Sequence, residues 1–170
     1  MDRLLNDPRY ERLVGDARHV LFTDPERFDV IEADAIWPHT SLSGLLYSVE
    51  YFRQVRARLI CVQWAPTTRT VNSFVSAFPF VELLFGDVGI PGILLGSERP
   101  IHFDGEAVAR RLRDPTLHAY FEAAGWDADA IGLLLSRTSL KVWGPDDPRP
   151  DDNIDTDLFP KDEFYLSAYN

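Results

Sequence analysis

The feature that most constrains this chain is an apolar strand that ends on an acid. Residues 28–33 form a short, mostly apolar run, and Asp34 follows it directly. A loop that contains Trp37 and His39 leads from there into an amphipathic helix over residues 48–59. Open α/β sheets place their binding residues at the carboxyl ends of strands, ahead of a crossover helix. The stretch predicts an α/β fold in which Asp34 either serves a functional site or only caps a turn.

Strand and helix patterns alternate over the first hundred residues. This alternation favours parallel βα units, and two later strands joined by a turn favour an antiparallel edge. The predicted strands cover residues 10–14, 28–33, 60–64, 81–85 and 92–95, and the predicted helices cover 18–22, 48–59 and 71–77.

The glycines between the last two predicted strands have a spacing similar to that of a phosphate-binding loop. Gly86, Gly89 and Gly92 are spaced three residues apart. A phosphate loop opens a helix, whereas this segment joins two strands. A hairpin turn is therefore the favoured interpretation.

Helical signals dominate after residue 100. Asp104 is a candidate cap for a helix over residues 106–112, and Pro115 begins a second helix that ends at Gly125. Asp127 is placed to cap a third helix. We therefore expect a core over residues 1–100 and a helical extension over 101–144. Residues 145–170 are expected to form a Pro/Asp-rich loop and an extended edge segment at 159–169.

Composition narrows the class of protein. The chain has 170 residues, 45% of them hydrophobic, which is enough for one packed core. Its net charge of -10 argues against binding to a nucleic acid backbone. The single cysteine, Cys61, lies in an apolar run and is expected in the core, so neither a disulfide nor a metal site is predicted. No signal peptide or membrane-spanning run is evident, which predicts a soluble cytoplasmic protein.

Several pieces of the sequence together resemble the spermidine synthase-like family, the polyamine aminopropyltransferases. They are residues 14–18 (Val-Gly-Asp-Ala-Arg), 28–34 (Phe-Asp-Val-Ile-Glu-Ala-Asp), 37–40 (Trp-Pro-His-Thr), 62–66 (Val-Gln-Trp-Ala-Pro) and the tail at 153–164. The resemblance implies a Rossmann-like, methyltransferase-type sheet, mostly parallel with an antiparallel edge, truncated at the N-terminus and followed by the helical extension. It also implies transfer of an aminopropyl group from decarboxylated S-adenosylmethionine to a small-molecule amine.

The resemblance assigns roles to individual residues. Asp34 matches the base that removes the proton from the amine, which an amine must lose before it attacks. Gly15, Asp16 and Ala17 match the cofactor-binding element: Asp16 beside the adenine amino group, and the Ala17 N–H toward a ring nitrogen. The alternative from the residues alone is that Asp16 is a turn acid after a strand.

The substrate side is implied by four further residues. Tyr47 matches an aromatic residue near the active-site loop, and Gln63 belongs to the strand motif at 62–66. Trp37 stands where the family usually has a second acid that grips a diamine, and an indole offers a cation–π face instead. His39 is a candidate substrate contact or an ordinary hydrogen-bonding residue.

Three family features are absent from the sequence. No Gly-x-Gly-type turn precedes Gly15, and the strands that would separate residues 10–14 from residues 28–33 in the sheet are missing. The turn that relatives usually have between the helix at 48–59 and the strand at Ile60 is also absent, so the helix should end early, near Arg56 to Arg58. Strands from another subunit, direct pairing of the two remaining strands, or a longer native chain would repair this gap, and we expect a homo-oligomer. Three functions stay open: an aminopropyltransferase completed by another chain or segment, a non-catalytic remnant or interaction module, and a methyltransferase that uses S-adenosylmethionine.

Overall fold

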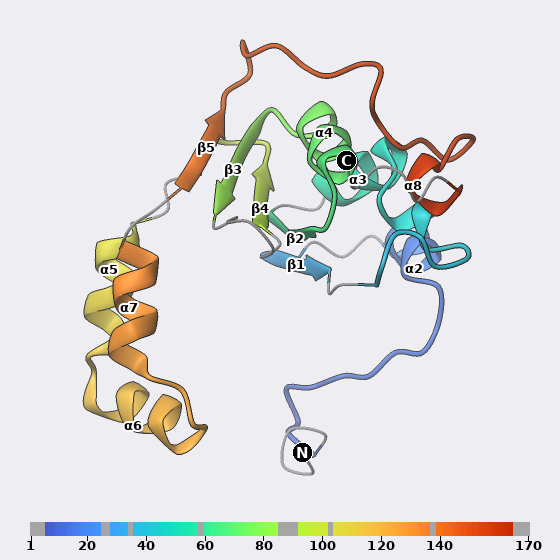
Figure 1. Ribbon diagram of the computed structural model, residues 1–170. Coiled ribbons are helices and arrows are strands. Elements are labelled where there is room, and N and C mark those ends of the chain that lie inside the picture. Colours follow the sequence, from blue (N-terminus) through green and yellow to red (C-terminus); the bar gives the residue numbers. More distant parts are fainter. Residues whose placement is uncertain are drawn as a thin grey trace.

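The computed structural model describes residues 6–24, 28–33, 36–57, 60–84, 92–101, 104–136 and 139–164. Within them an open five-stranded sheet is combined with helices, which confirms the predicted α/β class (Figure 1). The strands are β1 (Val30–Ala33), β2 (Ile60–Ala65), β3 (Phe80–Leu84), β4 (Gly92–Ser97) and β5 (Ser139–Trp143). The helices are α2 (Ala17–Thr23), the 3-10 turn η1 (Gly44–Leu46), α3 (Val49–Arg56), α4 (Thr68–Ala77), α5 (Gly105–Leu112), α6 (Pro115–Ala123), α7 (Ala128–Ser136) and α8 (Lys161–Phe164).

The sheet is mixed, with the strand order β1-β2-β4-β3-β5. β1 and β2 run parallel, whereas β4 is antiparallel to both β2 and β3, and β5 is antiparallel to β3. The prediction of a mostly parallel sheet is therefore wrong. Among the described strands, β1 and β2 are the one neighbouring pair that runs parallel. The crossover through α4 leaves a strand position open between β2 and β3, and the returning strand β4 fills it.

The predicted hairpin is confirmed, and one strand was not predicted. β3 and β4 pair antiparallel from Phe80 opposite Ser97 to Leu84 opposite Ile93. The turn glycines Gly86 and Gly89 lie outside the described residues. β5 adds to the free side of β3, a pairing between distant parts of the chain that local sequence patterns do not reveal.

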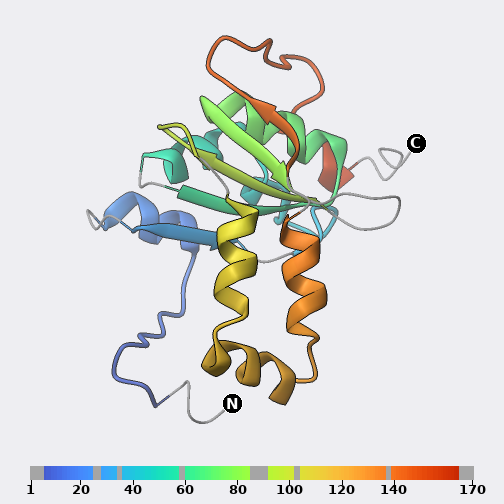
Figure 2. The same cartoon turned by 90° about the vertical axis from the view of Figure 1, so that its left-hand side faces the viewer.

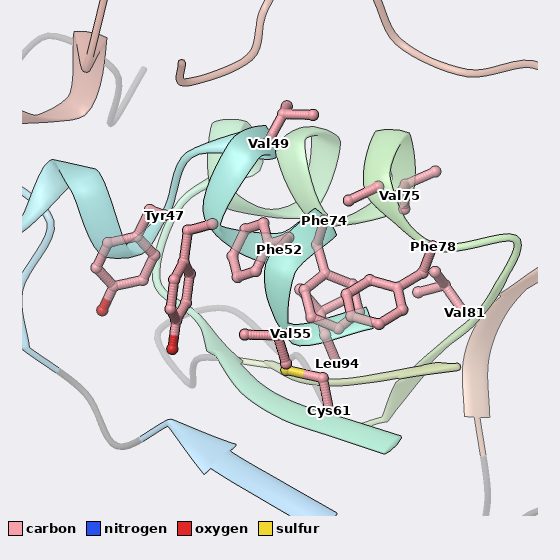
Figure 3. Close-up of a cluster of buried hydrophobic side chains, with 12 residues drawn as sticks. Tyr47, Val49, Phe52, Val55, Cys61, Phe74, Val75, Phe78, Val81 and Leu94 are labelled. Atoms are coloured by element: carbon pink, nitrogen blue, oxygen red, sulfur yellow. The ribbon is translucent and has the colours of Figure 1, made fainter. Parts of the chain in front are cut away.

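Helices α3 and α4 cover one face of the sheet and hold the core (Figures 1 and 3). Both begin at a hydroxyl cap: the Ser48 side chain accepts the Tyr51 N–H, and the Thr67 side chain accepts the Thr70 N–H. α3 ends at Arg56, as its sequence predicted. The core residues are Tyr47, Val49, Tyr51, Phe52, Val55, Cys61, Phe74, Val75, Ala77, Phe78, Val81 and Leu94.

Packed aromatic rings leave no room for a side chain at Gly96 in β4. The Phe74 ring lies 5.0 Å from that of Phe52 and 4.5 Å from that of Phe78, centroid to centroid. A Cβ atom at Gly96 would lie only 2.5 Å from the Phe74 ring and 2.7 Å from the Phe78 ring. Cys61 pairs with Gly96 across the sheet and is fully buried, which confirms it as a core residue, and burial raises the pKa of its thiol to about 12.

Helices α5, α6 and α7 project from the sheet as a helical extension (Figures 1 and 2). The predicted caps are confirmed: the Asp104 carboxylate accepts the Ala107 N–H and the Asp127 carboxylate accepts the Ala130 N–H. Gly125 follows α6 with a φ of +80°, a left-handed conformation that favours glycine. In the described residues, no helix is both long enough and apolar enough to cross a membrane.

The strand and the edge segment predicted near the two ends of the chain, at residues 10–14 and 159–169, are both wrong within the described residues. Residues 10–14 are extended coil outside the sheet, because no strand lies beside them to complete the backbone hydrogen bonds. We call this segment the arm. At the other end, Lys161–Phe164 forms the short helix α8 in place of part of the edge segment predicted for 159–169, and residues 165–170 lie outside the described residues.

Candidate functional site

A cavity of about 580 Å³ lies between α2 and β1. The last residues of the arm and α2 form one wall, and β1 with the loop after it forms another. The described lining residues are Leu13, Gly15, Ala17, Val20, Leu21, Phe28, Val30, Ile31, Glu32, Ala33, Ile36, Leu46 and Tyr51. The lining is mostly apolar, and Glu32 is the one carboxylate among these described residues.

Two of the three predicted cofactor-binding residues line this cavity. Gly15 and Ala17 lie on its wall at the start of α2. Asp16 caps α2 instead, and its carboxylate accepts the Arg18 N–H at 2.8 Å. Asp16 is exposed, and a carboxylate that accepts one N–H keeps lone pairs for a further donor. The structure thus supports the turn-acid role of Asp16 without assigning it a ligand.

The predicted base, Asp34, lies outside the described residues. The nearest described residues on either side of it, Ala33 at the end of β1 and Ile36 in the following loop, both line the cavity. The cavity therefore joins the segment around Asp16 to the segment around Asp34.

Tyr47 fixes the loop that follows Asp34. Its ring is 1% exposed, and its hydroxyl donates a hydrogen bond to the carbonyl oxygen of Ile36. Figure 3 shows the ring at one end of the core cluster. Tyr47 is not one of the described lining residues. Because Ile36 lines the cavity, the hydrogen bond from Tyr47 positions the cavity wall.

Trp37 and His39 lie together on the outside of the same loop. Their ring centroids are 5.7 Å apart, and Trp37 is 56% exposed. Neither belongs to the described lining of the cavity. A role for either residue in substrate binding stays a prediction.

Gln63 is buried beside the end of β1. It pairs with Ala33 across the parallel strands and is 1% exposed. Its amide nitrogen donates to the Trp64 carbonyl oxygen at 3.2 Å, while its Oε1 atom is buried without a hydrogen-bond partner. A buried acceptor without a partner is costly, so this oxygen marks a polar position beside the end of β1.

Tyr51 is a site residue that the sequence analysis did not single out. It lines the cavity and is 4% exposed, and no hydrogen bond of its hydroxyl to another described residue is observed. Burial raises the pKa of Tyr51 to about 12, so the hydroxyl stays protonated and remains a donor. Tyr51 lies among the buried residues of α3, a pattern that does not distinguish a cavity wall from the core.

An ionic contact anchors α2 against the body of the protein. The Arg18 guanidinium binds both carboxylate oxygens of Asp157, at 2.8 and 2.7 Å, and also donates to the Leu45 carbonyl oxygen at 3.1 Å. The Ser48 hydroxyl donates to the same carboxylate at 2.6 Å. The Arg18 hydrogen bonds hold the pKa of Asp157 below its ordinary value. The segment that precedes α8 therefore sets the position of one cavity wall.

A second polar cluster lies beneath the same C-terminal segment. Asp155 is fully buried; its Oδ1 accepts the Asp162 N–H at 3.0 Å, and its Oδ2 has no partner. The Asp162 carboxylate is paired with Arg69 and accepts the Thr67 hydroxyl. Burial, followed by the neighbouring Asp162 carboxylate, raises the pKa of Asp155 to about 7. These groups fasten the segment to α4 and are separate from the lining of the cavity.

Among the described residues, no group of His, Cys, Asp and Glu side chains is arranged to hold a metal ion. Comparison with known proteins adds no assignment, because no family model and no curated protein matches this chain. The chemistry available at the described site is that of an apolar cavity with one carboxylate, Glu32, and one buried hydroxyl donor, Tyr51.

Proposed function

We propose that this chain is a spermidine synthase-like protein. In this proposal it transfers an aminopropyl group from decarboxylated S-adenosylmethionine to an amine in the cavity between α2 and β1. The observation that carries the proposal is that Gly15 and Ala17 share one cavity with Ala33 and Ile36, the described residues nearest Asp34 on either side. A Rossmann-like sheet is part of the proposal, and the mixed order β1-β2-β4-β3-β5 is compatible with it.

The cavity is compatible with such a cofactor in size and character. Small-molecule sites commonly measure roughly 300–1,000 Å³ and are mostly apolar with a few polar groups. The cavity of about 580 Å³ falls within that range. Its apolar walls suit an adenine ring, and the Glu32 carboxylate suits a cationic centre. The cofactor would supply an alkyl group activated by a sulfonium.

The proposed reaction assigns proton transfer to Asp34. An ammonium is first attracted to a carboxylate and then gives up a proton to it. The freed nitrogen lone pair forms the new C–N bond, while the C–S bond breaks and its electron pair stays on sulfur. The Tyr51 hydroxyl, which remains protonated, is a donor available to orient a bound group.

A non-catalytic binding module is the second candidate. The observations that favour it are that Asp16 is engaged as a helix cap and that Trp37 is exposed away from the described lining. A methyltransferase that uses S-adenosylmethionine would occupy the same cavity. The three candidates differ in which cofactor binds and in whether product forms.

The test is to measure binding of decarboxylated S-adenosylmethionine and of S-adenosylmethionine by calorimetry, and to detect aminopropylated amine by mass spectrometry. We expect preferential binding of the decarboxylated form. We further expect Asp34→Asn to reduce turnover by about 10²–10⁴-fold without loss of binding. Asp29→Asn, an exposed acid at the start of the same segment, is the matched control. Binding without any product would favour the module, and no binding of either cofactor would reject the transferase.

A further inference from the structure

The outer edge of β1 is open. β1 is the terminal strand of the described sheet and pairs only with β2 among the described strands. Half of the backbone N–H and C=O groups of a terminal strand point away from its single neighbour. Val30 on this strand is 54% exposed, and Ile36 beyond its end is 49% exposed. An apolar open edge of this kind is a template for another strand.

The arm is the matching unpaired element. Tyr10, Leu13 and Val14 are 41%, 66% and 87% exposed. Among the described residues, no hydrogen bond involves the backbone of residues 11–14. Figure 1 shows the arm leading away from the sheet, so within one chain it does not lie along β1.

The side chains of the arm and of β1 are complementary in one register. If Arg12 is opposite Glu32 in an antiparallel pair, Leu13 is opposite Ile31 and Val14 is opposite Val30. Arg12 and Glu32 are exposed, and neither makes an ion pair with another described residue. Opposite charges and apolar pairs that face each other across strands stabilise a sheet.

The anchoring of α2 explains why a second copy is the partner. Arg18 binds Asp157 and the Leu45 carbonyl oxygen, which holds the start of α2 against its own chain, and the arm leads away from there (Figure 1). We propose that the arm of a second copy of this chain adds antiparallel to the open edge of β1. Because each copy offers both an arm and an edge, the exchange is reciprocal and closes as a two-fold dimer. The dimer can form whether or not the chain is a transferase, but Val30, Ile31 and Glu32 also line the cavity, so an added strand and a bound ligand would share that wall.

Cysteine cross-linking tests the pairing. Val14→Cys and Val30→Cys proteins, purified separately and labelled with different isotopes, are mixed and oxidised. We expect a disulfide between differently labelled chains, identified by mass spectrometry, because facing Cα atoms in an antiparallel pair lie within disulfide range. The matched control pairs Val14→Cys with Val142→Cys, which is 60% exposed on the opposite edge strand β5 and should give no such cross-link.

Charge reversal tests the register. Light scattering of the full chain should show a dimer. Arg12→Glu should raise the dimer dissociation constant by about tenfold, and Arg12→Glu combined with Glu32→Arg should restore it. Both residues are exposed, so the variants should keep the circular dichroism of the original chain. A mass of one chain at every concentration would overturn the proposal. So would a disulfide that forms only within one chain when it carries both cysteines.

Discussion

Two segments outside the sheet, residues 153–162 and the arm at residues 10–14, are held in opposite ways. The first contains Asp155 and Asp162, which are buried and hydrogen-bonded, and Asp157, which binds Arg18. The second makes no backbone hydrogen bond over residues 11–14 to any described residue. A segment without regular structure is thus fixed by buried polar partners, whereas the arm keeps its backbone groups available for another strand.

The largest effect should follow from breaking the buried ion pair of the C-terminal segment. Asp162→Ala would leave the Arg69 guanidinium, whose side chain is 12% exposed, without its carboxylate. We expect the free energy of unfolding to fall by about 3–5 kcal/mol, measured by urea denaturation. Asp151→Ala, an exposed acid in the preceding loop, is the control and should change it by less than about 0.5 kcal/mol. A small effect of Asp162→Ala would show that the segment is not fastened by this pair.

Asp155 should give the same segment a characteristic pH dependence. Burial raises its pKa from 3.8 to about 7 in the folded protein, so folding favours the protonated carboxyl. Its contribution to stability is therefore complete below about pH 4 and is lost as the pH rises through about 7. Asp155→Asn keeps an oxygen that can accept the Asp162 N–H but cannot ionise.

The measurement for Asp155 is the urea midpoint from about pH 4 to about pH 8. The Asn variant should lose less stability than the original chain over this range. Asp157 contributes in the opposite direction, because its pKa is lowered by Arg18 and its contribution is lost as the pH falls. Equal pH slopes for the original chain and Asp155→Asn would contradict the assignment.

The smallest effect is expected in the arm. Val14→Ala removes two methyl groups from a side chain that is 87% exposed. At protein concentrations low enough to keep the chain monomeric, the free energy of unfolding should change by less than about 0.5 kcal/mol. A large change under those conditions would mean that the arm packs onto its own chain, and the contrast with residues 153–162 would disappear.

Local signals in the sequence predicted most elements of the fold. Asp104 and Asp127 cap helices where their positions indicated. The absence of a turn before Ile60 correctly predicted that α3 ends early. Such signals are read within a few residues of the chain, which is why they can be recognised without the structure.

The site was predictable only in part. The sequence pointed to the segment at Gly15 and Ala17 and to the end of β1, and the structure places both on one cavity. It did not reveal Tyr51 as a lining residue, because an aromatic residue on an amphipathic helix has the same pattern whether it faces the core or a cavity. The strand predicted at residues 10–14 is wrong, because a strand pattern in the sequence does not specify which other strand it pairs with.

The sequence by itself determined the α/β class, the capped starts of α5 and α7, the early end of α3, the hairpin and the burial of Cys61. The tertiary structure decided that β4 lies between β2 and β3, that β5 joins the sheet, and that residues 153–162 fasten α2 and α4. The physical reason is that caps, turns and hydrophobic periodicity act between near neighbours in the chain. Strand order, edge pairing and buried ion pairs join residues far apart in sequence, and only packing selects those partners.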